Sequence, residues 1–187
     1  MDTPAVHQSR QGPGARRRFW GNASGASALE FSLVALPFFL LLLAVLEVGL
    51  VYFVDFTLDS AVYQASRLVR TGQAQNQNFD ASQFKAQVCN HLVAPINCAA
   101  LQLDVRHYTS FSNAASNLTN PLDANGNLKS TFSYDPGVGG DIVVVQAFYE
   151  WDLLAKMPKQ IGLSNLADGN RLFVSIAAFR NEPFTVQ

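Results

Sequence analysis

Charge is scarce in this sequence. Only 14% of its 187 residues are Asp, Glu, Lys or Arg, and the formal net charge is −1. Nucleic acids are bound through many cationic side chains, so this composition gives a general nucleic-acid role no electrostatic basis. The basic residues that do cluster, Arg16, Arg17 and Arg18, lie near the N-terminus.

Signals for catalysis are also few. The sequence contains no glycine-rich phosphate loop, nucleophile elbow or metalloprotease motif. Its three histidines are His7 near the N-terminus, His91 beside a cysteine, and His107 in a predicted strand. For His107 a core or rim position is a simpler interpretation than a catalytic one. We therefore expect no enzyme, and neither a cofactor nor a metal.

One segment faintly resembles a calcium-binding loop. Asp123, Asn125 and Asn127 alternate as its ligands would, but the twelfth position is Tyr134 where such loops carry glutamate. A hairpin turn between residues 122 and 128 is the better interpretation of this segment.

Cysteine is rare as well. The only two are Cys89 and Cys98, and in an oxidising compartment we expect them to form a disulfide around Pro95. Two free thiols are the alternative. A zinc site is less favoured, because His91 alone would leave its tetrahedron incomplete.

What the sequence does contain is one long apolar run. Residues 31–46 carry no charge, and beyond Glu47 the apolar character resumes through Val54. The 22 residues 33–54 would make about 33 Å of helix, enough to cross a hydrocarbon core of about 30 Å. A buried helix of a soluble protein is the alternative, but residues 40–43 and their neighbours are apolar all round.

The flanks of this run predict its orientation. Four arginines, Arg10 and residues 16–18, precede it, whereas Asp55 and Asp59 follow it. By the positive-inside rule we expect a single-pass protein of the inner membrane, with its N-terminus cytoplasmic and its C-terminal part periplasmic.

A small-residue cut site precedes the run instead of following it. Residues 25–31 read Gly-Ala-Ser-Ala-Leu-Glu-Phe. After the run, residues 51–53 read Val-Tyr-Phe, which is a poor cleavage site for signal peptidase. An ordinary secretory signal has the opposite order, and this one is typical of a prepilin. We therefore expect residues 1–25 to be a disordered basic leader, and the apolar segment to stay in the mature protein.

Cleavage after Gly25 would create a new amine at Ala26, one helical turn from Glu30. A carboxylate entering the bilayer edge costs roughly 2.5 to 3.5 kcal/mol on insertion scales unless it is paired. One hypothesis is that Glu30 pairs with the new amine of a neighbouring subunit and sets the register between subunits. The alternative is that Glu30 only marks the membrane boundary and favours the positive end of the helix dipole.

Two other residues stand out inside the span. Pro37 lacks a backbone donor and is expected to bend the helix. Glu47 either pairs with another pilin helix or extends to the outer interface, and the sequence does not decide between them.

Beyond the membrane we expect the helix to continue as an amphipathic one. Phe56, Val62 and Val69 can share an apolar face, while Asp55, Asp59, Arg67 and Arg70 keep contact with water. Gly72 is the expected stop, so the long helix spans residues 26–72.

Residues 73–187 are expected to form an α+β head. After a polar linker at residues 73–78, Asp80 and Gln83 suggest a capping box that opens a helix over residues 80–93. Alternation predicts a strand at residues 101–106 with Gln102, Asp104 and Arg106 on its wet face. Residues 142–151 and 171–179 predict two more strands. Because a three-stranded sheet with one apolar face needs cover, both helices should pack on it.

Five stretches of this sequence resemble TadE-like proteins, the minor pilins or pseudopilins of bacterial tight-adherence (Flp-type) pilus systems. They are residues 25–31, 33–37, 46–49, 149–151 and 179–184. Phe31 replaces the tyrosine common after the glutamate in major Flp pilins, which favours the minor class. The resemblance implies cleavage by prepilin peptidase between Gly25 and Ala26. The partners it implies are the major pilin, other minor pilins, the inner-membrane Tad machinery and the lipid bilayer.

Two interpretations from other classes remain beside the pilin. One is a periplasmic binding domain on an uncleaved membrane anchor, and the other is a membrane-tethered enzyme. The first differs from a pilin in keeping its first 25 residues. The second would need a cluster of polar residues in the head, and the sequence shows no pattern that indicates one.

Overall fold

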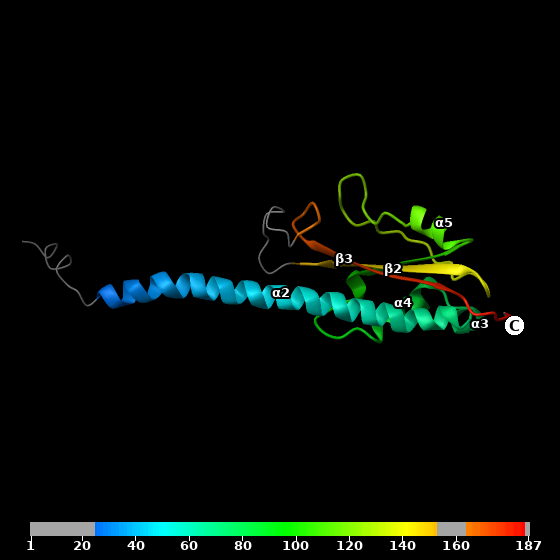
Figure 1. The fold of residues 1–187 in the computed structure, drawn as a ribbon, viewed down its shortest axis with the longest axis horizontal. Coiled ribbons are helices and arrows are strands. Elements are labelled where there is room, and N and C mark those ends of the chain that lie inside the picture. The colour runs from blue at the N-terminus through cyan, green and yellow to red at the C-terminus, as the bar shows by residue number, and fades with distance from the viewer. Residues whose placement is uncertain (1–24, 153–163, 186–187) are drawn as a thin grey trace, which may run out of the picture. The chain divides into compact units, whose positions relative to one another are not determined.

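A computed structural model describes residues 25–152 and 164–185 (Figure 1). The chain divides into two compact units, Met1–Val45 and Leu46–Gln187. The leader, residues 1–25, is predicted to be disordered. Apart from Gly25, its residues lie outside the described ones.

The longest element is α2, which spans Ala26–Arg70 and contains Pro37. Its end is set by Gly72, whose backbone φ is +77°, a left-handed conformation that favours glycine. A Cβ added there would also lie 2.5 Å from a ring carbon of Phe184. The helix stop predicted at Gly72 is therefore confirmed, and the position needs glycine for two separate reasons.

In the first unit, the side chains of α2 are almost all exposed. Large apolar residues are open to solvent along it, with exposed fractions such as 77% for Leu33 and 60% for Leu40. Among the described residues, this is the one helix long and apolar enough to cross a membrane. The core helix of a soluble protein would be mostly buried, whereas the most apolar stretch here is only 11% buried.

The second unit contains one antiparallel sheet. Its strands are β1 (Leu101–Tyr108), β2 (Ile142–Trp151) and β3 (Arg171–Arg180), in the order β1-β2-β3. The register pairs Leu101 with Tyr149 and Ile142 with Arg180. All three predicted strands are confirmed, and so is the α+β class.

One face of the sheet packs against helices. Residues 51–69 of α2 and the helix α4 (Ala81–Cys89) bury their apolar sides on β1, β2 and the start of β3. Fully buried members of this core include Leu58, Val62, Phe84 and Val145. The prediction that Phe56 joins the apolar face was wrong: its side chain is 75% exposed, because Val54, Leu58 and Val62 take the inward positions.

The segment between α2 and β1 is more ordered than predicted. In place of a linker, residues after Gly72 form the short helix α3 (Gln73–Asn76). The capping box of Asp80 and Gln83 is present, but α4 ends at Cys89 instead of residue 93. Cys89 and Cys98 form the predicted disulfide, which ties the end of α4 to the turn of 3-10 helix Cys98–Ala100 before β1.

The other face of the sheet is also covered, which the sequence analysis did not anticipate. The short helix α5 (Phe111–Ser116) and the long loop that follows it lie on the opposite side of the sheet from α4 (Figure 1). Phe132 stacks on Phe148 with ring centroids 5.0 Å apart, and the predicted hairpin is present as a bridge between Leu122 and Leu128. Both faces of β2 are therefore buried.

This cover corrects the prediction for Asp104. Its side chain is only 1% exposed, although alternation placed it on a wet face. It accepts hydrogen bonds from Thr119 Oγ1 at 2.5 Å and from the backbone N–H of Ser133 at 2.8 Å. Arg106 also donates to it at 2.8 Å. The Asp104 carboxylate is therefore still hydrogen-bonded, but to protein groups in place of water.

Candidate functional site

Gly25, the residue that precedes the predicted cut, is accessible. Gly25 is exposed, and a Cβ added to it would meet no described atom within 4 Å. Ala26 is the first residue of α2. A protease needs an open, unhindered backbone at the bond it cuts, and Gly25 meets that requirement. Cleavage itself stays a prediction.

Glu30 lies in an exposed apolar setting. It is exposed on α2, and its chain neighbours Leu29 and Phe31 are each 72% exposed. A little further along, Ser32 and Ala35 form a shallow depression of about 370 Å³ bordered by larger side chains such as Phe39. Ala35 follows Glu30 by five residues, which is about 140° around the helix axis. The carboxylate and the depression therefore occupy different faces of α2.

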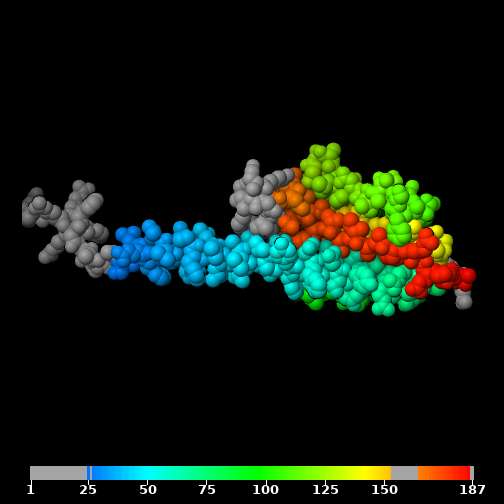
Figure 2. Space-filling model, in the orientation of Figure 1, coloured from blue at the N-terminus to red at the C-terminus, as the bar shows by residue number. Residues whose placement is uncertain are grey.

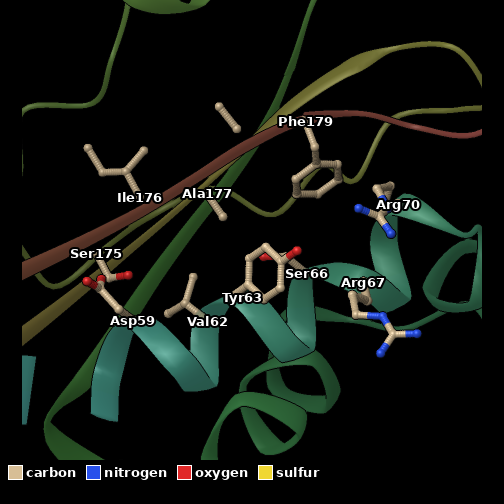
Figure 3. A pocket seen from close by; sticks show the side chains of 11 residues that line it. Asp59, Val62, Tyr63, Ser66, Arg67, Arg70, Ser175, Ile176, Ala177 and Phe179 are labelled. Atoms are coloured by element: carbon tan, nitrogen blue, oxygen red, sulfur yellow. The ribbon is translucent and has the colours of Figure 1, made fainter. Parts of the chain in front are cut away.

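A groove in the second unit lies between α2 and the outer edge of β3. It has a volume of about 430 Å³, and Figure 3 shows its walls. Asp59, Tyr63 and Arg67 line it from α2, while Ser175, Ala177 and Phe179 line it from β3. Arg70 lies at the same end as Arg67 and Phe179 (Figure 3).

Charge is distributed unevenly along this groove. Asp59 lies at the end near Ser175, and Arg67 lies at the end near Phe179 (Figure 3). Arg70 is engaged by Glu182, with Nε 3.6 Å from the carboxylate. On the groove floor, Ser66 is 3% exposed and its Oγ has no hydrogen-bond partner. The groove is thus acidic at one end and basic at the other.

One comparison with known proteins gave a match, and it lies in the N-terminal part of the chain. Residues 25–67 match the family model of TadE-like proteins. The resemblance predicted from the sequence is therefore confirmed over residues 25–67. The match does not extend beyond this N-terminal part of the chain. TadE-like proteins are a pilus-associated structural family, and the match links this chain to a Tad pilus system. Searches of curated proteins and of solved structures gave no match.

The TadE-like segment contains four of the predicted site residues after the cut. They are Ala26, Glu30, Pro37 and Glu47. It also contributes Asp59, Tyr63 and Arg67 to the groove. The predicted resemblance at residues 149–151 and 179–184 falls outside the matched range.

Glu47 is placed unlike Glu30. Its side chain is only 6% exposed, and its Oε1 has no hydrogen-bond partner. It belongs to the second unit, whereas Glu30 belongs to the first. The two acids of the TadE-like segment therefore meet different surroundings, and their roles in assembly stay predictions.

The described residues of the head form no cluster typical of a metal site. Within residues 25–152 and 164–185, no three His, Cys, Asp or Glu side chains gather as metal ligands would. His107 pairs with Asp135 at 2.9 Å on the surface, at the rim of β1. The disulfide takes both cysteines, and His91 is exposed next to it.

Sequence reasoning missed the groove. Arg67 and Asp59 were identified only as water-contacting residues of an amphipathic helix, and Tyr63 was not singled out. The exposure of Tyr63, at 63%, depends on how β3 lies beside α2. A local sequence pattern contains no signal for that placement, since the two elements are more than 100 residues apart in the chain.

Proposed function

We propose that this chain is a TadE-like minor pilin that acts in the assembly of a Tad/Flp-type pilus. In this proposal prepilin peptidase removes residues 1–25, and α2 then packs with the helices of the major pilin and of other minor pilins. The head lies on the periplasmic side, where it meets further components. The single observation that carries the proposal is the TadE-like match over an exposed apolar helix that begins at Ala26.

The surfaces of the first unit suit a filament subunit. Open filaments form through heterologous contacts, in which one surface of a subunit meets a different surface of the next. Glu30 and the depression at Ser32 and Ala35 are two such surfaces on different faces of α2. In lipid, close helix packing at small residues and pairing of a carboxylate both favour association.

Intact-mass measurement tests this function directly. The full chain is expressed with and without an active prepilin peptidase, and its mass is measured in each case. We expect loss of the first 25 residues only with the peptidase, leaving a mature N-terminus at Ala26. Loss of the apolar segment as well, or an unchanged mass with the peptidase, would contradict the proposal.

Assembly is tested on surface fibres. Glu30→Gln removes the carboxylate but keeps its size, so we expect normal cleavage and at least tenfold less of the protein in sheared fibres. Glu150→Gln is the matched control, because Glu150 lies on β2 outside the groove and its amide replacement can still accept the hydrogen bond from Asn170. Normal incorporation of Glu30→Gln would refute the pairing role of Glu30.

The alternative function is a periplasmic binding domain on an uncleaved anchor. The groove between α2 and β3 is the observation that favours it, since a binding domain needs a concave surface. The intact-mass experiment separates the two, because an anchored binder keeps its leader whether or not the peptidase is present.

A further inference from the structure

We propose that the outer edge of β3 and the adjoining groove of α2 bind an extended segment of a partner chain, which adds to the sheet as a fourth strand. The proposal deepens the assembly function above and rests on it for the identity of the partner as a pilus component. The groove and the strand edge themselves are features of the second unit alone.

The first argument is the state of the two sheet edges. The edge of β1 is occupied, since Val105 N–H donates to Ser133 at 2.8 Å and Asp135 N–H donates to Val105 at 2.8 Å. In the described part of the chain, β3 has β2 as its only strand neighbour. An edge strand presents unpaired N–H and C=O groups, and strand addition satisfies them.

The second argument is the local sequence of this edge. Natural proteins protect an exposed edge with proline, with a bulge or with inward-pointing charges. Residues 172–179 of β3 contain no proline and no charged residue, and their ladder with β2 is continuous. Residues 172–179 therefore carry none of these three protections against strand pairing.

The third argument is the groove that flanks the edge. An added strand would lie about 4.8 Å from β3, which places it over the groove beside Tyr63. Tyr63 is 63% exposed, and the buried Oγ of Ser66 on the groove floor lacks a partner. An arriving polar side chain can satisfy that hydroxyl group.

Charge determines the chemistry of the occupant. Asp59 and Arg67 are eight residues apart on α2, or about 12 Å. A strand covers about 13 Å in four residues, and residues four apart lie on one face. The occupant therefore carries a basic residue facing Asp59, a small polar residue facing Tyr63, and an acidic residue facing Arg67.

The alternate residues of the occupant should be apolar. They would face the other side of the sheet, next to Val174 and Ile176 of β3. These side chains are 42% and 48% exposed, so an apolar neighbour would bury them further. The expected segment thus alternates apolar residues with a base, a small polar residue and an acid.

A designed peptide tests the proposal. The probe is fluorescein-labelled Thr-Val-Lys-Val-Ser-Val-Glu-Val-Thr, and binding to the full chain in detergent micelles is followed by fluorescence anisotropy, with empty micelles as background. We expect saturable binding that Arg67→Glu weakens about tenfold, because like charges then meet. Replacing the peptide Glu by Lys should restore binding to Arg67→Glu. Lys85→Glu, on α4 outside the groove, reverses the same charge and is the matched control, which should change affinity less than twofold.

Backbone methylation distinguishes strand addition from simple charge attraction. Alternate N–H groups of a strand point to opposite sides. One peptide is N-methylated at Lys, Ser and Glu, and a second at the intervening valines. We expect one of them to lose binding at least tenfold and the other to retain it.

The outcomes that overturn the proposal are distinct. They are absence of binding, equal effects of the two methylated peptides, or no effect of Arg67→Glu. Self-association that Arg67→Glu abolishes would show that a second copy occupies the edge, which also overturns it. Peptide binding requires no cleavage, so a chain that binds the peptide but is not cut by active prepilin peptidase would overturn the pilin function alone.

Discussion

At the scale of the residue, Asp104 is the polar group on which the second face of the sheet depends. Its carboxylate accepts hydrogen bonds from three residues, Arg106, Thr119 and Ser133. Arg106 is 43% exposed, whereas Asp104 is 1% exposed. The hydrogen bond that Arg106 donates to Asp104 raises the pKa of the Arg106 guanidinium. The carboxylate thus fixes the loop of residues 117–134 on the sheet.

We predict that Asp104→Ala destabilises the head by about 3 kcal/mol, because it leaves buried donors without an acceptor. Urea denaturation followed by near-UV circular dichroism gives the free energy of unfolding. Arg106→Gln is the matched control, and it should cost only about 1 kcal/mol, because that side chain is partly solvated. Equal costs for the two variants would show that the ion pair matters and the loop anchor does not.

Tyr134 gives the head a dependence on alkaline pH. Burial, and secondly the charge of Asp80, raise the pKa of its phenol to about 12 from the ordinary 10.0. Below pH 10 both folded and unfolded forms keep the proton, and above it the unfolded form loses its proton first. Stability is therefore complete below pH 10 and falls as pH rises towards 12, by about 2 to 3 kcal/mol.

Tyr134→Phe tests this dependence. Its hydroxyl group is buried and has no hydrogen-bond partner, so its removal should be neutral or slightly stabilising at pH 8. Between pH 10 and 12 we expect the variant to lose about 2 kcal/mol less than the parent protein in urea denaturation. Tyr63→Phe is the control, because the Tyr63 side chain is 63% exposed.

At the scale of the element, the disulfide joins α4 to the start of β1. Cys89 and Cys98 are nine residues apart, with Cα atoms separated by 5.7 Å. Closing so short a loop restricts the unfolded chain by about 2.5 kcal/mol. We predict that dithiothreitol lowers the free energy of unfolding by this amount. In the double variant Cys89→Ser/Cys98→Ser the free energy of unfolding should already be lower by the same amount and should not respond to dithiothreitol. A parent protein that does not respond to the reductant would contradict the prediction.

The elements also show which predictions from sequence succeed. The capping box at Asp80 and Gln83 and the stop at Gly72 were predicted correctly, because each depends on groups within four residues. The strand patterns were predicted for the same reason. Asp104 and Phe56 were misassigned, because their burial depends on a distant loop and on the position of the sheet. Caps and strand patterns can be predicted from neighbouring residues. Burial by a distant segment of the chain cannot.

The same reasoning explains the candidate sites. The cut site and the role of Glu30 stay predictions. The apolar run could be predicted because it is contiguous in sequence and because the membrane imposes a simple rule of length and polarity. The groove could not, since it joins α2 to β3 across the fold. No alternation or spacing in either element indicates that β3 is an edge strand.

At the scale of the whole molecule, α2 carries two kinds of apolar side chain. From Val51 onward its apolar residues alternate between the core of the head and the surface, whereas over residues 27–45 nearly all are exposed. Figure 2 shows the surface of the chain with its exposed helical segment in blue. Exposed apolar area of this extent is stable only when lipid or another helix covers it.

Charge placed within the apolar run should therefore remove the chain from the membrane. We predict that Leu40→Arg/Leu43→Arg, at roughly 2.5 to 3.5 kcal/mol for each arginine on insertion scales, shifts most of the chain from the membrane pellet to the alkaline-carbonate supernatant. Phe56→Arg is the matched control, because Phe56 is 75% exposed but follows the predicted span. It should stay in the pellet, since its arginine lies in water. Release of both variants would mean that charge anywhere on α2 is enough to remove the chain from the membrane. Retention of both would mean that the run at residues 33–54 is not what holds the protein in the bilayer.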